Sequence, residues 1–148
     1  MTNLKKRILL VEDNPDEREL IRLAFHEVGA LHEFSVVEDG QQAMDYLLGA
    51  GEFAERNIRE NPDIILLDLK LPKLNGFEVL KLIRANQNTA HVPVVIFTSS
   101  NIQTDMLAGY KIGANSVIAK PIEAAQYIEC VKILAAYWLR WNHPPPEA

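Results

Sequence analysis

Short apolar runs alternate along this chain with longer segments in which apolar side chains recur every three or four residues. Such runs of about four residues are too short for helices and predict buried strands. They occupy residues 8–11, 34–37, 64–67, 94–97 and 116–119. Helical spacing follows Asn14, Gly40 and Gly76 and covers residues 101–112 and 123–141. Strand and helix therefore alternate five times, which indicates an α/β protein with a parallel sheet and helices on both faces.

Residues with strong preferences for helix ends mark the first predicted helix. Asn14 suits the N-cap and Pro15 the first helical position, and Glu17 is placed to complete a capping box. Gly29 is expected to end this helix. The polar segment 49–61 predicts a loop with at most one helical turn.

The chain has 148 residues, a length that fits one domain, and we expect this domain to cover residues 5–141. Residues 142–148 contain three consecutive prolines and predict a flexible tail, with no output domain in the chain. The net charge of -5 and the lack of a Lys/Arg block argue against nucleic-acid binding, and no apolar run is long enough to cross a membrane. Because the single cysteine, Cys130, cannot form an internal disulfide, we expect a cytoplasmic protein.

Polar residues follow four of the five predicted strands. Glu12 and Asp13 follow the first strand, and the third, fourth and fifth strands lead to Asp68, Thr98 and Lys120. Because the carboxyl ends of parallel strands share one edge of a sheet, we expect these side chains to meet there. Carboxylates suit Mg²⁺, while a hydroxyl and an ammonium group suit phosphoryl oxygens. The pattern therefore predicts a site for a metal ion and a phosphoryl group.

This set of residues closely resembles the receiver domain of two-component response regulators. The resemblance spans about residues 5–139, and it is carried by Glu12-Asp13, Asp68, Thr98, Lys120-Pro121, Asn75-Gly76 and the segments 8–14 and 68–72. It implies a flavodoxin-like (βα)5 fold with the strand order 2-1-3-4-5. It also implies a protein that takes a phosphoryl group from a sensor histidine kinase and signals through altered protein contacts.

The same resemblance implies a role for each site residue. Asp68 would become the 4-aspartylphosphate and would bind Mg²⁺ with Asp13 and the backbone carbonyl of Lys70. Glu12 would act through a metal-bound water. Such a protein promotes only its own phosphorylation and dephosphorylation, so we do not expect an enzyme.

Two further residues complete the implied catalytic set with Asp68. Lys120 would pair with the phosphoryl group and Thr98 would hydrogen-bond to it. Pro121 is expected to follow a cis peptide bond. Phosphorylation would then change the surface around the fourth helix, the last strand and the last helix.

One position departs from the family pattern. Receivers usually carry Tyr or Phe three residues before the lysine, and this ring turns inward as the hydroxyl residue at the end of the fourth strand moves. Here the switch pair is Thr98 and Val117. The aromatic half of this pair is missing, so the sequence does not identify how a change at the site would reach the output surface.

Other features resemble the small stand-alone regulators of cyanobacterial phytochromes. These are the extended loop at 49–61, the lack of an effector domain and the ending Tyr137-Trp138-Leu139. The resemblance implies a phytochrome as the partner kinase.

The final predicted helix is apolar around most of its circumference. Five residues can face the sheet: Ala124, Ile128, Val131, Ala135 and Leu139. A separate apolar flank contains Cys130, Ile133, Tyr137 and Trp141. Because monomers rarely expose large apolar patches, we predict a homodimer through this flank.

Simpler interpretations apply to each residue alone. Glu12-Asp13 could be solvated acids, Lys120 a surface lysine, Cys130 a small buried side chain and Thr98 a helix N-cap. Two other functions remain open: a pseudo-receiver that binds partners without phosphorylation, and an aspartyl-phosphate hydrolase of the haloacid dehalogenase type. The hydrolase would need a second Asp where Lys70 stands. A flavin-binding module is disfavoured because the loop after the first strand is acidic.

Overall fold

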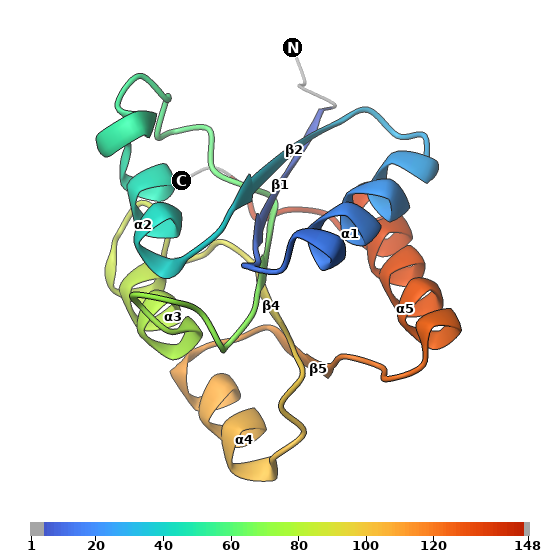
Figure 1. Cartoon of the computed structure of the whole chain (residues 1–148). Helices are drawn as coiled ribbons and strands as arrows, with labels where there is room; N and C mark the ends of the chain where they lie inside the picture. Colours follow the sequence, from blue (N-terminus) through green and yellow to red (C-terminus); the bar gives the residue numbers. More distant parts are fainter. Residues whose placement is uncertain (1–4, 147–148) are drawn as a thin grey trace.

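Five strands form one sheet in the structure, a computed structural model that describes residues 5–146. The strands are β1 (Lys6–Val11), β2 (His32–Val37), β3 (Ile64–Leu67), β4 (Val94–Thr98) and β5 (Ser116–Ala119). Their order is β2-β1-β3-β4-β5, and every neighbouring pair is parallel. The predicted flavodoxin-like topology is therefore confirmed (Figure 1).

Helices cover both faces of this sheet (Figure 1). They are α1 (Pro15–Glu27), α2 (Gly40–Leu48), α3 (Gly76–Ala85), α4 (Gln103–Ile112) and α5 (Ala124–Ala136). The helices α1 and α5 pack over one face and α2 and α3 over the other, which gives two core clusters. Successive residues of β1 serve the two clusters in turn, because side chains alternate along a strand.

Burial on both faces explains why the central strands are apolar at every position. Each residue of β3 is at most 1% exposed. A polar side chain inside this strand would lose its hydration without gaining a partner. Asp68, the residue after β3, is thus the first position at which a carboxylate can reach the edge of the sheet.

Gly76 brings the start of α3 against the loop that carries Asp68. A Cβ atom at Gly76 would lie 2.3 Å from the carbonyl oxygen of Asp68 and 2.7 Å from Cα of Leu69. Asn75 and Glu78 form a reciprocal capping box at the same helix end. The turn signal in the sequence therefore reflects a close approach of two backbone segments.

The first helix begins as predicted but uses one residue differently. The side chain of Asn14 accepts hydrogen bonds from the backbone N–H groups of Asp16 and Glu17. The predicted capping box is wrong, because Glu17 directs its carboxylate to Lys120 and Tyr127. An ammonium group and a buried hydroxyl are stronger partners for a carboxylate than one backbone N–H.

The final helix also differs from the prediction. It continues into a π-helical segment, Tyr137–Trp141. Ala124 and Ile128, which we expected to face the sheet, are exposed, whereas Leu134 and Trp138 are buried. The reason is that α5 packs against α1 as well as against the sheet, so its buried side is displaced toward α1.

The segment 49–61 forms the predicted loop with a single 3-10 turn, Gly51–Phe53. It packs on α2, where the guanidinium carbon of Arg56 lies 4.1 Å from the centre of the Tyr46 ring. Arg56 also donates a hydrogen bond to the carbonyl oxygen of Tyr46. The extended loop is therefore an ordered cover for the end of α2.

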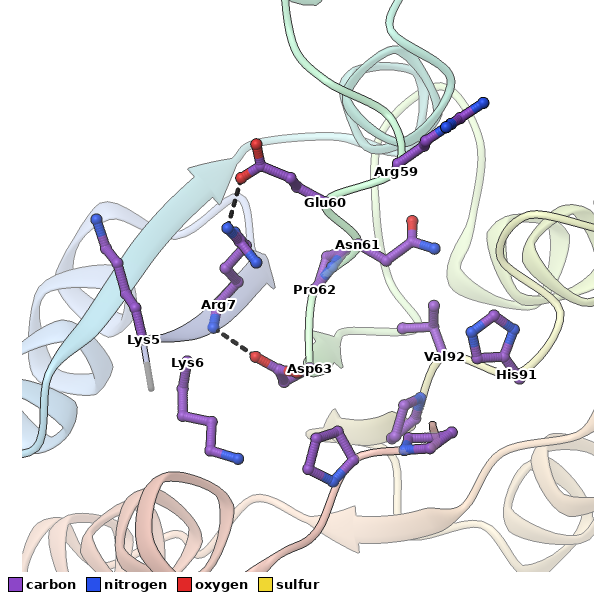
Figure 2. Close-up of a pocket in the computed structure, with 13 residues that line it drawn as sticks. Lys5, Lys6, Arg7, Arg59, Glu60, Asn61, Pro62, Asp63, His91 and Val92 are labelled. Atoms are coloured by element: carbon purple, nitrogen blue, oxygen red, sulfur yellow. Dashed lines mark hydrogen bonds and ion pairs between the residues drawn. The ribbon is translucent and has the colours of Figure 1, made fainter. Parts of the chain in front are cut away.

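A cavity of about 620 Å³ lies at the edge of the sheet where the strands begin (Figure 2). Arg7, Glu60 and Asp63 line it, and Pro144 and Pro145 complete its wall. The residues that follow, 147–148, lie outside the described part of the chain, so the flexibility of the tail stays a prediction. None of the helices described for residues 5–146 combines the length and the hydropathy that spanning a bilayer requires.

The close approach at Gly76 predicts that an alanine at this position destabilises the fold. Gly76→Ala should lower the free energy of unfolding by about 1–3 kcal/mol, because the new Cβ atom overlaps backbone that cannot move independently. Gly29→Ala is a comparison for backbone strain alone, since a Cβ atom there would meet nothing beyond its chain neighbours within 4 Å but its φ of +76° costs a non-glycine residue about 1–2 kcal/mol. Urea unfolding of both variants tests this. A loss at Gly76 well below about 1 kcal/mol would contradict the proposed close approach.

Candidate functional site

Three carboxylates from two neighbouring strand ends form an acidic cluster. Glu12 and Asp13 follow β1, and Asp68 follows β3. One oxygen atom of each carboxylate lies within 4.8 Å of the others. Glu12 and Asp68 are buried, at 2% and 7% exposure, while Asp13 is exposed. The predicted convergence at the carboxyl edge of the sheet is thus present in the structure.

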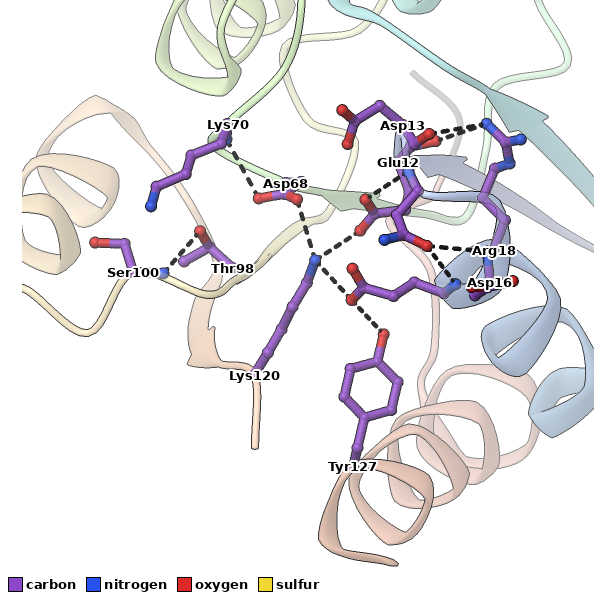
Figure 3. Close-up of polar contacts among 12 residues, drawn as sticks. Glu12, Asp13, Asp16, Arg18, Asp68, Lys70, Thr98, Ser100, Lys120 and Tyr127 are labelled. Atoms are coloured by element: carbon purple, nitrogen blue, oxygen red, sulfur yellow. Dashed lines mark hydrogen bonds and ion pairs between the residues drawn. The ribbon is translucent and has the colours of Figure 1, made fainter. Parts of the chain in front are cut away.

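Lys120 reaches this cluster from the end of β5 (Figure 3). Its Nζ lies 2.7 Å from Oε1 of Glu12, 2.9 Å from Oε1 of Glu17 and 3.1 Å from Oδ2 of Asp68. The Lys120 side chain is only 7% exposed. These contacts exclude the interpretation of Lys120 as an ordinary surface lysine.

Thr98 occupies the end of β4, between the strands that carry Asp68 and Lys120. It is fully buried, and its hydroxyl oxygen accepts a hydrogen bond of 3.3 Å from the backbone N–H of Ser100. The Thr98 carbonyl accepts a hydrogen bond of 2.7 Å from the backbone N–H of Lys120. Thr98 therefore anchors β5 through its backbone and keeps its hydroxyl hydrogen for another acceptor.

Backbone contacts hold the acidic loops in place. The backbone N–H of Lys70 donates to Oδ1 of Asp68 at 3.2 Å, and that of Asn14 donates to Oε2 of Glu12 at 3.2 Å. The guanidinium group of Arg18 donates to the carbonyl oxygen of Glu12 at 3.3 Å (Figure 3). These bonds orient the carboxylates before any ligand arrives.

The cluster has more negative charge than Lys120 can neutralise. Burial raises the pKa of Glu12 to about 7, against the opposing effect of Lys120 and with further help from Asp68 and Glu17. Burial alone would lower the pKa of Lys120, but its contacts with Glu12 and Asp68 raise the pKa above the usual value. The metal-free site is thus short of positive charge. A hard divalent cation, which prefers carboxylate oxygens, fits this donor set.

Two site residues were not found from the sequence. Glu17 joins Lys120 on one side and accepts a hydrogen bond of 2.8 Å from the hydroxyl of Tyr127 on the other. The sequence did contain an indication for Glu17. It lies in the first turn of the helix that directly follows Glu12-Asp13, so it starts at the same edge of the sheet. No comparable signal marks Tyr127, which depends on the packing of α5 against α1.

The structure contradicts one prediction beside Lys120 and gives the surroundings of Val117. The peptide bond before Pro121 is trans, so the predicted cis bond is wrong. The trans form is the lower-energy isomer before proline, and Lys120 makes its contacts from it. Val117 lies half-buried in β5, and a Cβ atom added at Gly109 of α4 would lie 3.3 Å from its Cγ2. Its backbone N–H donates to the hydroxyl of Tyr110 at 3.2 Å.

The chain belongs to the response regulator receiver domain family, which residues 8–132 match. The match agrees with the fold and with the order of Glu12-Asp13, Asp68, Thr98 and Lys120 along the chain. It favours the receiver interpretation over the hydrolase and flavin-binding alternatives.

Several relatives extend along almost the whole chain. The probable methanogenesis regulatory protein FilR2 of Methanothrix harundinacea is 37% identical over 141 residues, which are 95% of this chain and 88% of that protein. Response regulator Rcp1 of Synechocystis sp. is 35% identical over 138 residues, 93% of this chain and 92% of that protein. The predicted resemblance to stand-alone regulators of cyanobacterial phytochromes is therefore confirmed.

Two solved structures of such regulators share the fold closely. The Mn²⁺-bound form of Rcp1 has a TM-score of 0.89 at 33% identity and covers 95% of this chain and 99% of its own. The phosphorylated cyanobacterial phytochrome response regulator RcpA has a TM-score of 0.89 at 37% identity, covering 96% and 99%. Homologous receivers thus hold a divalent metal ion and are phosphorylated.

The raised pKa of Glu12 predicts a pH-dependent stability of the metal-free protein. A carboxyl group whose pKa is raised on folding stabilises the fold fully below about pH 4.5, and this stabilisation is lost as the pH rises through about 7. The loss should be on the order of 1–3 kcal/mol. Glu12→Gln should remove this part of the pH dependence. Urea unfolding in a chelator from pH 5 to pH 8 measures it, and parallel curves for the two proteins would contradict the prediction.

Proposed function

We propose that Asp68 accepts a phosphoryl group from a phosphohistidine of a sensor histidine kinase. The observation that carries this proposal is the meeting of Lys120 and two further carboxylates, those of Glu12 and Asp13, around one buried aspartate. A lone buried carboxylate would be a poor nucleophile facing an anionic phosphate, because like charges repel. The 3.1 Å contact between Lys120 and Oδ2 of Asp68 offsets this repulsion.

We further propose that Mg²⁺ binds to Asp13, to Asp68 and to the backbone carbonyl of Lys70, with Glu12 acting through a metal-bound water. The support is the fit of a hard cation to the three carboxylates, together with the burial of Glu12, which raises its pKa, with a smaller contribution from Asp68 and Glu17. When bound, the ion neutralises phosphoryl oxygens and the carboxylates together.

The residues of the chain then have separate tasks. A carboxylate oxygen of Asp68 forms the new O–P bond while the N–P bond of the kinase histidine breaks, and the histidine nitrogen keeps the electron pair. Lys120 pairs with the transferred group, and Thr98 donates its hydroxyl hydrogen to a phosphoryl oxygen. Attack by water later returns free phosphate. The chain thus promotes only its own phosphorylation and dephosphorylation.

A phytochrome is the kinase that we propose as the partner. The support is the likeness to RcpA, a phytochrome response regulator, over 96% of the chain at 37% identity. The net charge of -5 favours a protein partner over a nucleic acid. A cytoplasmic location stays a prediction from the composition.

We also propose that a second copy of the chain covers the apolar flank of α5 and the π-helical segment. Three of its residues are exposed: Ile133 by 62%, Tyr137 by 48% and Trp141 by 73%. Cys130, the fourth predicted contact, is half-buried and already packs partly on the core. In a dimer with two-fold symmetry, the flank of one chain packs against the same flank of the other chain.

Phosphotransfer tests the main proposal directly. Incubation with a phosphorylated phytochrome kinase and Mg²⁺ should move the label to the wild-type chain and leave Asp68→Asn unlabelled, because the amide lacks the nucleophilic oxygen. Removal of Mg²⁺ should reduce the rate at least about a hundredfold, since the carboxylates then repel the phosphoryl group. Stoichiometric labelling of Asp68→Asn would place the phosphoryl group elsewhere and refute the assignment.

The dimer is tested by a charge in the flank. Ile133→Glu should shift the chain to a monomer at concentrations where the wild type is dimeric, because a buried, unpaired carboxylate opposes association. Ile122→Glu is the matched control, since Ile122 is fully exposed and lies outside the flank. Light scattering over a concentration series gives the masses. A wild-type chain that stays monomeric throughout would refute the proposed dimer.

A further inference from the structure

Lys120 already has three carboxylate partners. Its ammonium group donates hydrogen bonds to Glu12 at 2.7 Å and to Asp68 at 3.1 Å, and it forms an ion pair of 2.9 Å with Glu17. A phosphoryl group on Asp68 brings three more strong acceptor oxygens to the same ammonium group. The phosphoryl group on Asp68 therefore competes with the present partners of Lys120.

Glu17 is the partner whose release costs least. Asp68 carries the phosphoryl group itself, and Glu12 is 2% exposed and belongs to the acidic cluster. Glu17 lies outside that cluster on α1, and its side chain is 25% exposed, so water can solvate its carboxylate after release.

Glu17 is also the contact that reaches beyond the site. Its Oε1 accepts a hydrogen bond of 2.8 Å from the hydroxyl of Tyr127, in the first turn of α5. The Tyr127 ring is 8% exposed, and its centre lies 5.4 Å from that of Phe97 in β4. Burial, and next Glu17, raise the pKa of Tyr127, so its hydroxyl remains a donor. A displacement of Glu17 is thus felt by a buried ring that fixes the start of α5.

We propose that Glu17 and Tyr127 are positioning residues that transmit phosphorylation from Lys120 to α5, in place of the aromatic switch residue that Val117 does not provide. This inference rests on the proposed phosphorylation of Asp68. A competing route exists through α4, where the hydroxyl of Tyr110 accepts from the backbone N–H of Val117.

Amide NMR of the full chain with Mg²⁺ and beryllofluoride, a phosphoryl mimic, separates the two routes. In the wild type, amides of α5 such as those of Val131 and Leu134 should shift along with those beside Thr98. In Tyr127→Phe, which keeps the ring but loses the hydroxyl, the α5 shifts should fall at least about threefold while those beside Thr98 remain. Tyr110→Phe is the matched control and should behave as the wild type. Loss of the α5 shifts in Tyr110→Phe alone, or their persistence in Tyr127→Phe, would overturn the proposal.

The rate of phosphorylation by acetyl phosphate gives a second readout that a purely structural role would not move in this direction. Glu17→Gln removes a negative charge and weakens the contact with Lys120, so the rate should rise about three- to tenfold. Tyr110→Phe, which lies outside the acidic site, should stay within about twofold of the wild type. An unchanged or lower rate in Glu17→Gln would refute the release of Glu17.

These outcomes also separate the link from the function on which it rests. A wild-type chain that takes up neither the phosphoryl group nor the mimic would overturn the proposed function and the link together. Normal uptake, with α5 responding equally in the wild type and Tyr127→Phe, would overturn the link alone.

Discussion

The ammonium group of Lys120 is the interaction on which the site depends. It lies within 3.1 Å of three carboxylates that come from β1, α1 and β3, so it ties together segments that are distant in sequence. One positive charge cannot balance these acids and Asp13 as well, and the pKa of Glu12 is raised by burial and, to a smaller extent, by Asp68 and Glu17. The gathering of carboxylates suits a hard cation, and a cation bound there would favour the approach of a phosphoryl group.

The sheet makes this arrangement possible because its strands are parallel. All five carboxyl ends lie at one edge, and β1, β3 and β4 are neighbours there. The acids therefore meet without any long loop. The backbone must nevertheless approach closely for Asp68 to stay in place, and Gly76 permits this approach by leaving the space of a Cβ atom to the Asp68 carbonyl. The cavity at the opposite edge, beside the tail prolines, is physically separate from this chemistry.

The sequence was most informative where one physical rule acts alone. Residues 64–67 form β3 as predicted, because a strand buried on both faces must be apolar throughout. Asp68 and Lys120 followed from the ends of such strands. The sequence was least informative where tertiary partners compete. From its neighbours in sequence, Glu17 was expected to complete a capping box. In the folded protein it contacts Lys120 instead, which is distant along the chain. The sheet-facing side of α5 was misplaced because the packing of α1 beside it is not encoded in helical periodicity alone.

The structure shows what surrounds Val117 at the position where receivers usually carry an aromatic residue. β5 is an edge strand, and Val117 packs beside Gly109 of α4 with no aromatic group to rotate between two positions. The chain after β5 leads from Lys120 directly into α5, and α5 packs on α1, which carries Glu17. The contacts from Lys120 through Glu17 to Tyr127 therefore connect the site to α5 without involving α4. Because α5 also carries the exposed apolar flank, a receiver built in this way can change its contacts without an aromatic residue in β5.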